Sequence, residues 1–135
     1  MKLVRYIMSA CICLPFVAQA AQTEAERSLS IELTKAVIEV NASAPQLLDE
    51  ETRLDSAATF RNFIIYNNTM VNYAAEQLDA NAFAPLIEDA VIGPLCANKA
   101  LASFVDVGVV MVYRYHGKNG QFITEVSKDM ATCEK

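Results

Sequence analysis

The chain contains little of several residue types on which common kinds of protein chemistry depend. One histidine, His116, is present among 135 residues, and the four glycines form no glycine-rich loop. A single histidine without a neighbouring cysteine gives no zinc-binding spacing and does not define a Ser-His-acid triad. The absence of a glycine-rich loop argues against a phosphate cradle. We therefore expect no cofactor and no metal, and we interpret His116 as a residue at the end of a strand.

Basic residues are also scarce. The sequence has eleven lysine and arginine residues against sixteen aspartate and glutamate residues. Nucleic-acid binding draws its affinity from clustered basic side chains that neutralise phosphates, so we expect no nucleic-acid partner. The excess of negative charge instead favours attraction of basic partners over long distances.

Residues 1–20 have the organisation of a signal peptide. Lys2 and Arg5 precede an apolar run over residues 7–18, and the sequence AQA, ending at Ala20, has the small residues of a cleavage site. The apolar run is shorter than the ~20 residues of a stable transmembrane helix. We expect cleavage after Ala20, a periplasmic or secreted protein, and no stable membrane span after cleavage; a retained anchor is the alternative.

The mature chain keeps two of the four cysteines. Cys11 and Cys13 lie in the leader, where modification of Cys11 would instead make the chain a lipoprotein. An even pair in an exported protein predicts a disulfide between Cys96 and Cys133, with two free thiols or a catalytic thiol as alternatives. Removal of the two basic leader residues gives the mature chain a net charge of −7. Residues 21–135 are long enough for a single domain with one core.

The mature sequence alternates between helical and strand periodicity. The predicted elements are a helix over residues 24–40 behind a capping box, strands over 52–60 and 62–73, a helix that ends before Gly93, and strands over 109–116 and 122–127. This α-β-β-α-β-β order predicts an α+β two-layer sandwich. We expect a four-stranded antiparallel sheet with the helices on one face.

The start of the second helix has two interpretations. Asp79 or Asn81 would cap it with Pro85 one turn inside, where the proline would bend the helix. A start near Ala84 places the proline at the first helical position, where it costs nothing. Further along, Asn98 is the predicted cap of another short helix.

The last two predicted strands form the clearest local motif. Asn-Gly at residues 119–120 favours a tight hairpin turn. This register predicts that Arg114 lies opposite Glu125, where a charge pair contributes from a few tenths to about 1 kcal/mol. It also predicts that Phe122 shares a face with Tyr115.

Two groups of polar residues are candidates for a binding surface. The stretch LDEETRLD, residues 48–55, holds five charged side chains between the first helix and the first strand. A second group belongs to the strand over residues 62–73, on the face that we expect the helices to leave open. The candidate surface comprises Asp49, Glu51, Arg53, Tyr66, Asn68 and Asn72. Solvated polar residues without a ligand are the simpler interpretation of both groups.

The carboxylates of residues 48–55 also permit the hypothesis of a small hydrolase. Glycoside hydrolysis needs only two carboxyl groups about 5–9.5 Å apart. Neighbouring side chains in a strand point to alternate faces, however, which favours a solvated connection over a paired-carboxylate site. We therefore name no catalytic residue.

Several segments resemble a group of small exported bacterial proteins with no assigned activity. They are PQLLDEETRLD at residues 45–55, YNNT at 66–69, YRYHGKNG at 113–120, and the pair Cys96 and Cys133. The resemblance covers nearly the whole mature chain. It implies a bacterial periplasmic setting, supports the pairing of the two cysteines and brings no catalytic residues. We interpret the chain as a binding or protein-interaction module, such as an inhibitor, immunity protein or accessory subunit, with an unidentified protein partner.

Overall fold

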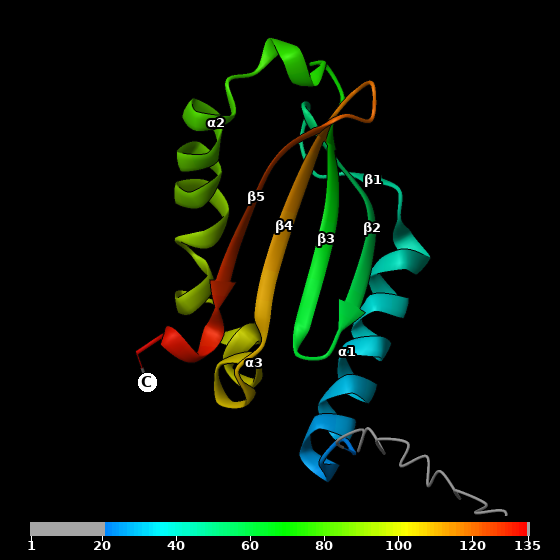
Figure 1. The fold of residues 1–135 in the computed structure, drawn as a ribbon, viewed down its shortest axis with the longest axis vertical. Helices are drawn as coiled ribbons and strands as arrows, with labels where there is room; N and C mark the ends of the chain where they lie inside the picture. Colours follow the sequence, from blue (N-terminus) through cyan, green and yellow to red (C-terminus); the bar gives the residue numbers. More distant parts are fainter. Residues whose placement is uncertain (1–20, 135) are drawn as a thin grey trace, which may run out of the picture.

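A long helix lies along one side of the sheet. The computed structural model describes residues 21–134, so the predicted signal peptide lies outside the described residues. α1 spans Glu24–Ser43 (Figure 1). The Thr23 hydroxyl accepts a hydrogen bond from the Glu26 amide, and the Glu26 carboxylate accepts one from the Thr23 amide. These bonds satisfy donors that the first helical turn leaves free, and they confirm the predicted capping box.

Within the described residues, five strands form one mixed sheet. In spatial order they are β1 (Gln46–Leu47), β2 (Thr52–Phe60), β3 (Phe63–Met70), β4 (Val110–Gly117) and β5 (Phe122–Asp129). β3 and β4 are parallel, and the other neighbouring strands are antiparallel. The predicted α+β class is confirmed, but the prediction of a four-stranded antiparallel sheet is wrong in strand number and in the direction of the central pair.

The connection between β3 and β4 explains this difference. An antiparallel neighbour needs only a tight turn, whereas a parallel neighbour needs a long crossover that is usually helical. The helical segment after β3 is such a crossover, and it brings β4 back alongside β3 in the same direction (Figure 1). The extra strand, β1, is two residues long, which is too short for a periodic pattern to indicate.

The second helix begins at the first of its two predicted starts. After the short turn η1 (Ala75–Gln77), α2 spans Ala80–Ile87 and contains Pro85. The Asp79 carboxylate accepts a hydrogen bond from the Asn81 amide, 2.9 Å away, and so caps the helix. α2 continues into a π-helical turn, η2 (Glu88–Ile92), which ends at Gly93 as predicted.

Short turns then lead to a third helix. η3 (Leu95–Ala97) and η4 (Lys99–Leu101) precede α3 (Ala102–Val107). The Asn98 side chain accepts a hydrogen bond from the Ala100 amide, which confirms Asn98 as a cap. Among the described residues, no single helix is long and apolar enough to span a membrane; the bent pair Ala80–Ala97 and Lys99–Val107 meets that test by length and composition only.

The helices bury one face of the sheet. Leu33 of α1, Ile64 of β3 and Met111 of β4 belong to one core cluster and are at most 2% exposed. Phe83 of α2 packs against a second cluster that contains Tyr115 of β4. Burying a large apolar side chain contributes about 1.5–3 kcal/mol, so these contacts fix the helices to the sheet.

A side-chain amide of α1 pairs with the backbone of β2. Asn41 Oδ1 accepts a hydrogen bond from the Ala57 amide at 2.7 Å, and Asn41 Nδ2 donates one to the Ala57 carbonyl at 2.9 Å. β1 pairs with β2 only opposite Arg53 and Leu54. Asn41 therefore satisfies a part of the β2 edge that the two-residue strand does not reach.

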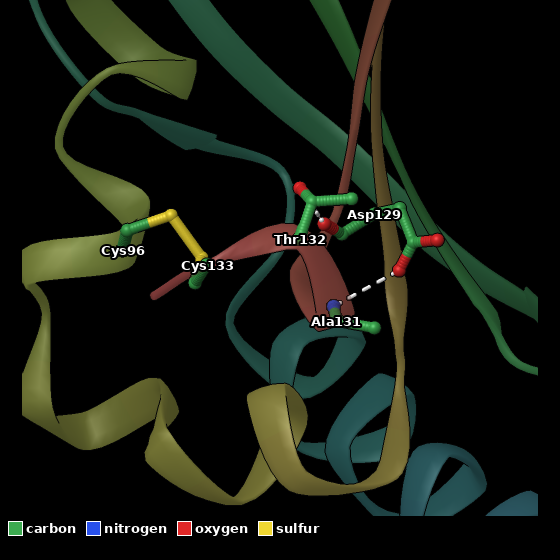
Figure 2. Close-up of a disulfide and its surroundings, with 5 residues drawn as sticks. All are labelled: Cys96, Asp129, Ala131, Thr132 and Cys133. Atoms are coloured by element: carbon green, nitrogen blue, oxygen red, sulfur yellow. Dashed lines mark hydrogen bonds between the residues drawn. A yellow bond between two sulfur atoms is a disulfide. The ribbon is translucent and has the colours of Figure 1, made fainter. Parts of the chain in front are cut away.

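A disulfide fastens the end of the chain to the segment between α2 and α3. Cys96 and Cys133 are bonded, with Cα atoms 5.4 Å apart, which confirms the predicted pairing (Figure 2). The turn η5 (Met130–Thr132) carries Cys133 to this position. The Asp129 carboxylate caps that turn by accepting a hydrogen bond from the Ala131 amide at 2.9 Å (Figure 2).

Candidate functional site

A groove separates α1 from α3. It encloses about 770 Å³, and its apolar lining includes Leu29, Leu33 and Ala36 of α1 and Phe104 of α3. Leu33 is fully buried, and the other three side chains are half-buried against the same core cluster. The helical period of α1 places Leu29, Leu33 and Ala36 in one apolar stripe. The structure leaves part of that stripe accessible from the groove.

The rim of the groove is acidic. Glu26, Glu32 and Glu39 of α1 line it together with one cation, Lys35. Lys35 Nζ lies 2.9 Å from Glu32 Oε1, and both side chains are about two-thirds exposed. An exposed pair of this kind contributes little to stability. The rim therefore has a net negative charge. It lies beside the accessible apolar residues Leu29, Ala36 and Phe104, which form the floor of the groove.

A second hollow lies at the N-terminal end of α1. It encloses about 580 Å³ and adjoins the groove through their shared residues Glu26, Leu29 and Val107. Its remaining lining residues are Ala21, Gln22, Arg61 and Asn62. The turn between β2 and β3 therefore faces the start of α1.

The charged stretch at residues 48–55 comprises the turn between β1 and β2, residues 48–51, and the first four residues of β2. Asp49 Oδ1 accepts hydrogen bonds from the amides of Glu51 at 2.8 Å and Thr52 at 2.7 Å. The bond from Glu51 is the main reason that the pKa of Asp49 is lowered. These bonds reverse the chain, so Leu47 comes to lie opposite Arg53.

Three of the predicted surface residues meet at this end of the sheet. Besides Asp49, Glu51 accepts a hydrogen bond from the Tyr73 hydroxyl at 3.1 Å, which raises the pKa of Tyr73. Asn72 donates a hydrogen bond to the Glu50 carbonyl at 3.2 Å. Asp49 thus stabilises the β1–β2 turn itself, whereas the bonds of Glu51 and Asn72 hold that turn against the chain just after β3.

The carboxylates of this stretch are bound to separate partners. Asp55 accepts hydrogen bonds from Arg53 Nε and from the Thr69 hydroxyl, each at 2.5 Å, on the sheet face opposite the helices. Neither hollow described above is lined by residues 48–55. In the part of the chain that the structure describes, no three metal-binding side chains gather at one place. The geometry gives the hydrolase hypothesis no support.

Tyr66 and Asn68 do not lie on the open face of the sheet, where we expected them. They share the helix-covered face with Ile64, and Asn68 is only 1% exposed, so they do not form an open surface with Asn72. Tyr66 stacks on Tyr113 with ring centroids 5.1 Å apart, and burial raises the pKa of both tyrosines. The expectation failed because the alternation of β3 assigns residues to two faces without indicating which one the helices cover.

No protein-family model matches the chain, and no curated protein matches it by sequence. Three solved structures share its fold. A Pseudomonas aeruginosa protein described as secreted has 17% identity and a TM-score of 0.69, covering 84% of this chain and 100% of its own. The type 2 secretion pilotin EpsS of Vibrio vulnificus has 16% identity and a TM-score of 0.65, covering 83% and 97%.

The third similar structure is the type II secretion system pilotin AspS of Vibrio cholerae. It has 16% identity and a TM-score of 0.62, and the match covers 82% of this chain and 96% of the pilotin. At these identities the likeness shows the fold alone. The α+β arrangement of this chain is therefore one that secretion pilotins also have.

Proposed function

We propose that this protein is an exported interaction module that holds an apolar segment of a partner protein in the groove between α1 and α3. The observation that carries the proposal is the accessible apolar floor formed by Leu29, Ala36 and Phe104. When a partner covers apolar side chains that are accessible in a concave site, their removal from water lowers the free energy and favours binding. Similarity of fold to a protein described as secreted and to two pilotins supports an exported location and an accessory role in secretion.

The charge of the rim specifies the chemistry of the partner. Glu26, Glu32 and Glu39 line the α1 side of the groove, and Lys35 is the one cation among the lining residues. A partner segment with apolar side chains flanked by lysine or arginine would place opposite charges across the rim. Such complementarity raises the rate of association and selects against acidic segments.

Site-specific photocrosslinking tests this proposal in the periplasm. A photoreactive side chain at Ser103, an exposed lining residue on α3, is expected to capture one partner protein. The matched control is the same side chain at Ile38, which is 62% exposed on α1 and does not line the groove. Adducts that are equal at the two positions, or absent from Ser103, would contradict the proposal.

A substitution in the floor provides an independent test. Leu29→Glu adds a carboxylate to an apolar site that is already surrounded by acidic residues, so the Ser103 adduct should disappear. Ile38→Glu adds the same charge outside the groove and should leave the adduct unchanged. Circular dichroism of both variants separates loss of binding from loss of folding.

A further inference from the structure

The turn between β2 and β3 presents aromatic side chains to solvent. Phe60 and Phe63 lie directly opposite each other in the ladder and are 64% and 37% exposed. Arg61 lies between them in the chain, with its guanidinium carbon 5.3 Å from the centre of the Phe60 ring. Two exposed aromatic rings with an adjacent cation are typical of segments that enter the interfacial region of a bilayer.

This turn lies at the end of the molecule where the N-terminal segment joins the fold. Ala21 and Gln22 line the same hollow as Arg61 and Asn62. Figure 1 shows that α1 extends past the β2–β3 turn, so the start of α1 and this turn lie at the same end of the molecule, whereas the β4–β5 turn is at the opposite end of the sheet. Ala21 and Gln22, the first described residues, therefore lie close to the β2–β3 turn that carries Phe60 and Phe63.

The length of the intervening chain limits how far this end can lie from a membrane. The apolar run of the predicted signal peptide covers residues 7–18, and Ala21 follows three residues later. Three residues extend at most about 11 Å. While the apolar run occupies the bilayer during export, the Phe60 turn is held within reach of the lipid surface.

We propose that in the precursor, which still carries residues 1–20, the turn from Phe60 to Phe63 contacts the phospholipid surface. The two rings would lie among the acyl chains near the headgroups, and Arg61 would lie beside the phosphates. Glu24 and Glu26 at the start of α1 disfavour a strongly anionic surface, so the expected lipids are zwitterionic. This contact is separate from the groove and does not depend on its occupant.

A tryptophan at the turn makes the contact measurable, because the chain contains no other tryptophan. The full chain with Phe60→Trp is reconstituted into vesicles of phosphatidylethanolamine and phosphatidylcholine with or without brominated acyl chains. We expect a blue-shifted emission that the brominated lipids quench. The matched control is Phe122→Trp, since Phe122 is 57% exposed at the opposite end of the sheet, and its emission should be neither shifted nor quenched.

A second substitution distinguishes two causes of quenching. The turn could contact the lipid itself, or residues 1–20 could simply hold the turn near the membrane. Phe63→Ser in the Phe60→Trp chain removes the cross-strand ring and should reduce quenching, while circular dichroism shows an intact fold. Quenching that is absent at position 60, equal at positions 60 and 122, or unaffected by Phe63→Ser would overturn the proposal. None of these results depends on whether a protein partner binds the groove.

Discussion

Asn41 shows how one polar side chain can terminate a sheet. Its amide presents a donor and an acceptor to the backbone of Ala57, in the manner of a neighbouring strand. An edge with unpaired backbone groups is open to pairing with other chains, and the amide occupies two of these groups at Ala57. The apolar periodicity of α1 predicts the helix but gives no sign of this role, because the partner is sixteen residues away in sequence.

Asn41→Ala is expected to destabilise the fold by roughly 1–3 kcal/mol, because two partly buried backbone groups lose their partner. Urea denaturation measures the change. Asn72→Ala is the control, since Asn72 makes one exposed hydrogen bond to the backbone and its loss should cost about 0.5 kcal/mol or less. Equal losses of stability in the two variants would show that the hydrogen bonds of Asn41 stabilise the fold no more than the exposed bond of Asn72 does.

The raised pKa of Tyr115 predicts how the stability of the fold changes at alkaline pH. Burial, together with the charge of Asp49, raises the pKa of Tyr115 to about 12, whereas the phenol of an unfolded chain has a pKa of about 10. The folded state thus keeps a proton that the unfolded state releases. Its contribution to stability is complete below pH ~10 and is lost as the pH rises toward 12.

The measurement is urea denaturation at a series of alkaline pH values. Tyr115→Phe removes this titration, so the variant should lose stability less steeply than the parent chain above pH ~10. Tyrosinate absorbance should appear together with unfolding. Titration of every tyrosine near pH 10 in a chain that remains folded would contradict the expectation.

Among the elements, the β4–β5 hairpin is the one that local sequence determines best. The predicted pairing of Arg114 with Glu125 is confirmed, with 2.8 Å between Nε and Oε2. The turn itself is centred on Lys118 and Asn119, because the Gly120 amide donates a hydrogen bond to the Gly117 carbonyl at 2.8 Å. The prediction for Phe122 is wrong, because a bulge shifts the register and places Phe122 opposite His116 instead of on the face of Tyr115. A bulge inserts one residue and changes which face the following side chains occupy.

Two glycines of this hairpin are required for different reasons. A Cβ at Gly117 would overlap the backbone nitrogen of Ala75 and lie 2.9 Å from the Ala74 carbonyl carbon, so Gly117→Ala should cost about 2–3 kcal/mol. Gly120 has open space but a φ of 80°, so Gly120→Ala should cost roughly 1–2 kcal/mol. Thermal denaturation should rank Gly117→Ala as the more damaging change; the reverse order would contradict the predicted overlap.

The candidate groove was only partly predictable from its elements. The helical period of α1 places Leu29, Leu33 and Ala36 on one face, and Phe104 is inward in α3. Periodicity shows which face is apolar but not how closely a second helix covers it, because that spacing depends on the segment that joins α2 to α3. The accessible floor therefore follows from tertiary packing.

For the molecule as a whole, the disulfide is a covalent constraint on the C-terminal end of the fold. It joins residues 37 apart in sequence and holds the end of β5 beside η3. In the chain-entropy account, closing such a loop stabilises the fold by about 4 kcal/mol. The pairing was predictable because the expected removal of residues 1–20 would leave two cysteines in a chain that we expect to be exported.

Cys133→Ser is expected to lower the thermal midpoint by roughly 10 °C and to make the C-terminal tail accessible to protease. Cys96→Ser should have the same effect, and the double variant should be no worse than either single one. Scanning calorimetry and limited proteolysis in oxidising buffer provide the two measurements. An unchanged midpoint would show that the bond contributes little to stability.

The topology was the part of the fold that local patterns specified least. Helix and strand positions follow from periods and caps, as for α1 and β2, whose predicted starts at residues 24 and 52 are confirmed. The order of elements is compatible with β4 on either side of the sheet and in either direction. The choice is made by how the crossover helices pack, which no short stretch of sequence encodes.

The parallel pairing of β3 with β4 also means that the sheet is completed late when the chain emerges N-terminus first. During synthesis α1, β2 and β3 emerge before any residue of β4, so one edge of β3 has no strand beside it until the crossover has followed. Pairings between distant segments form slowly. Through that interval the inner edge of the future sheet is an unpaired strand, open to a chaperone or to misassembly with another chain.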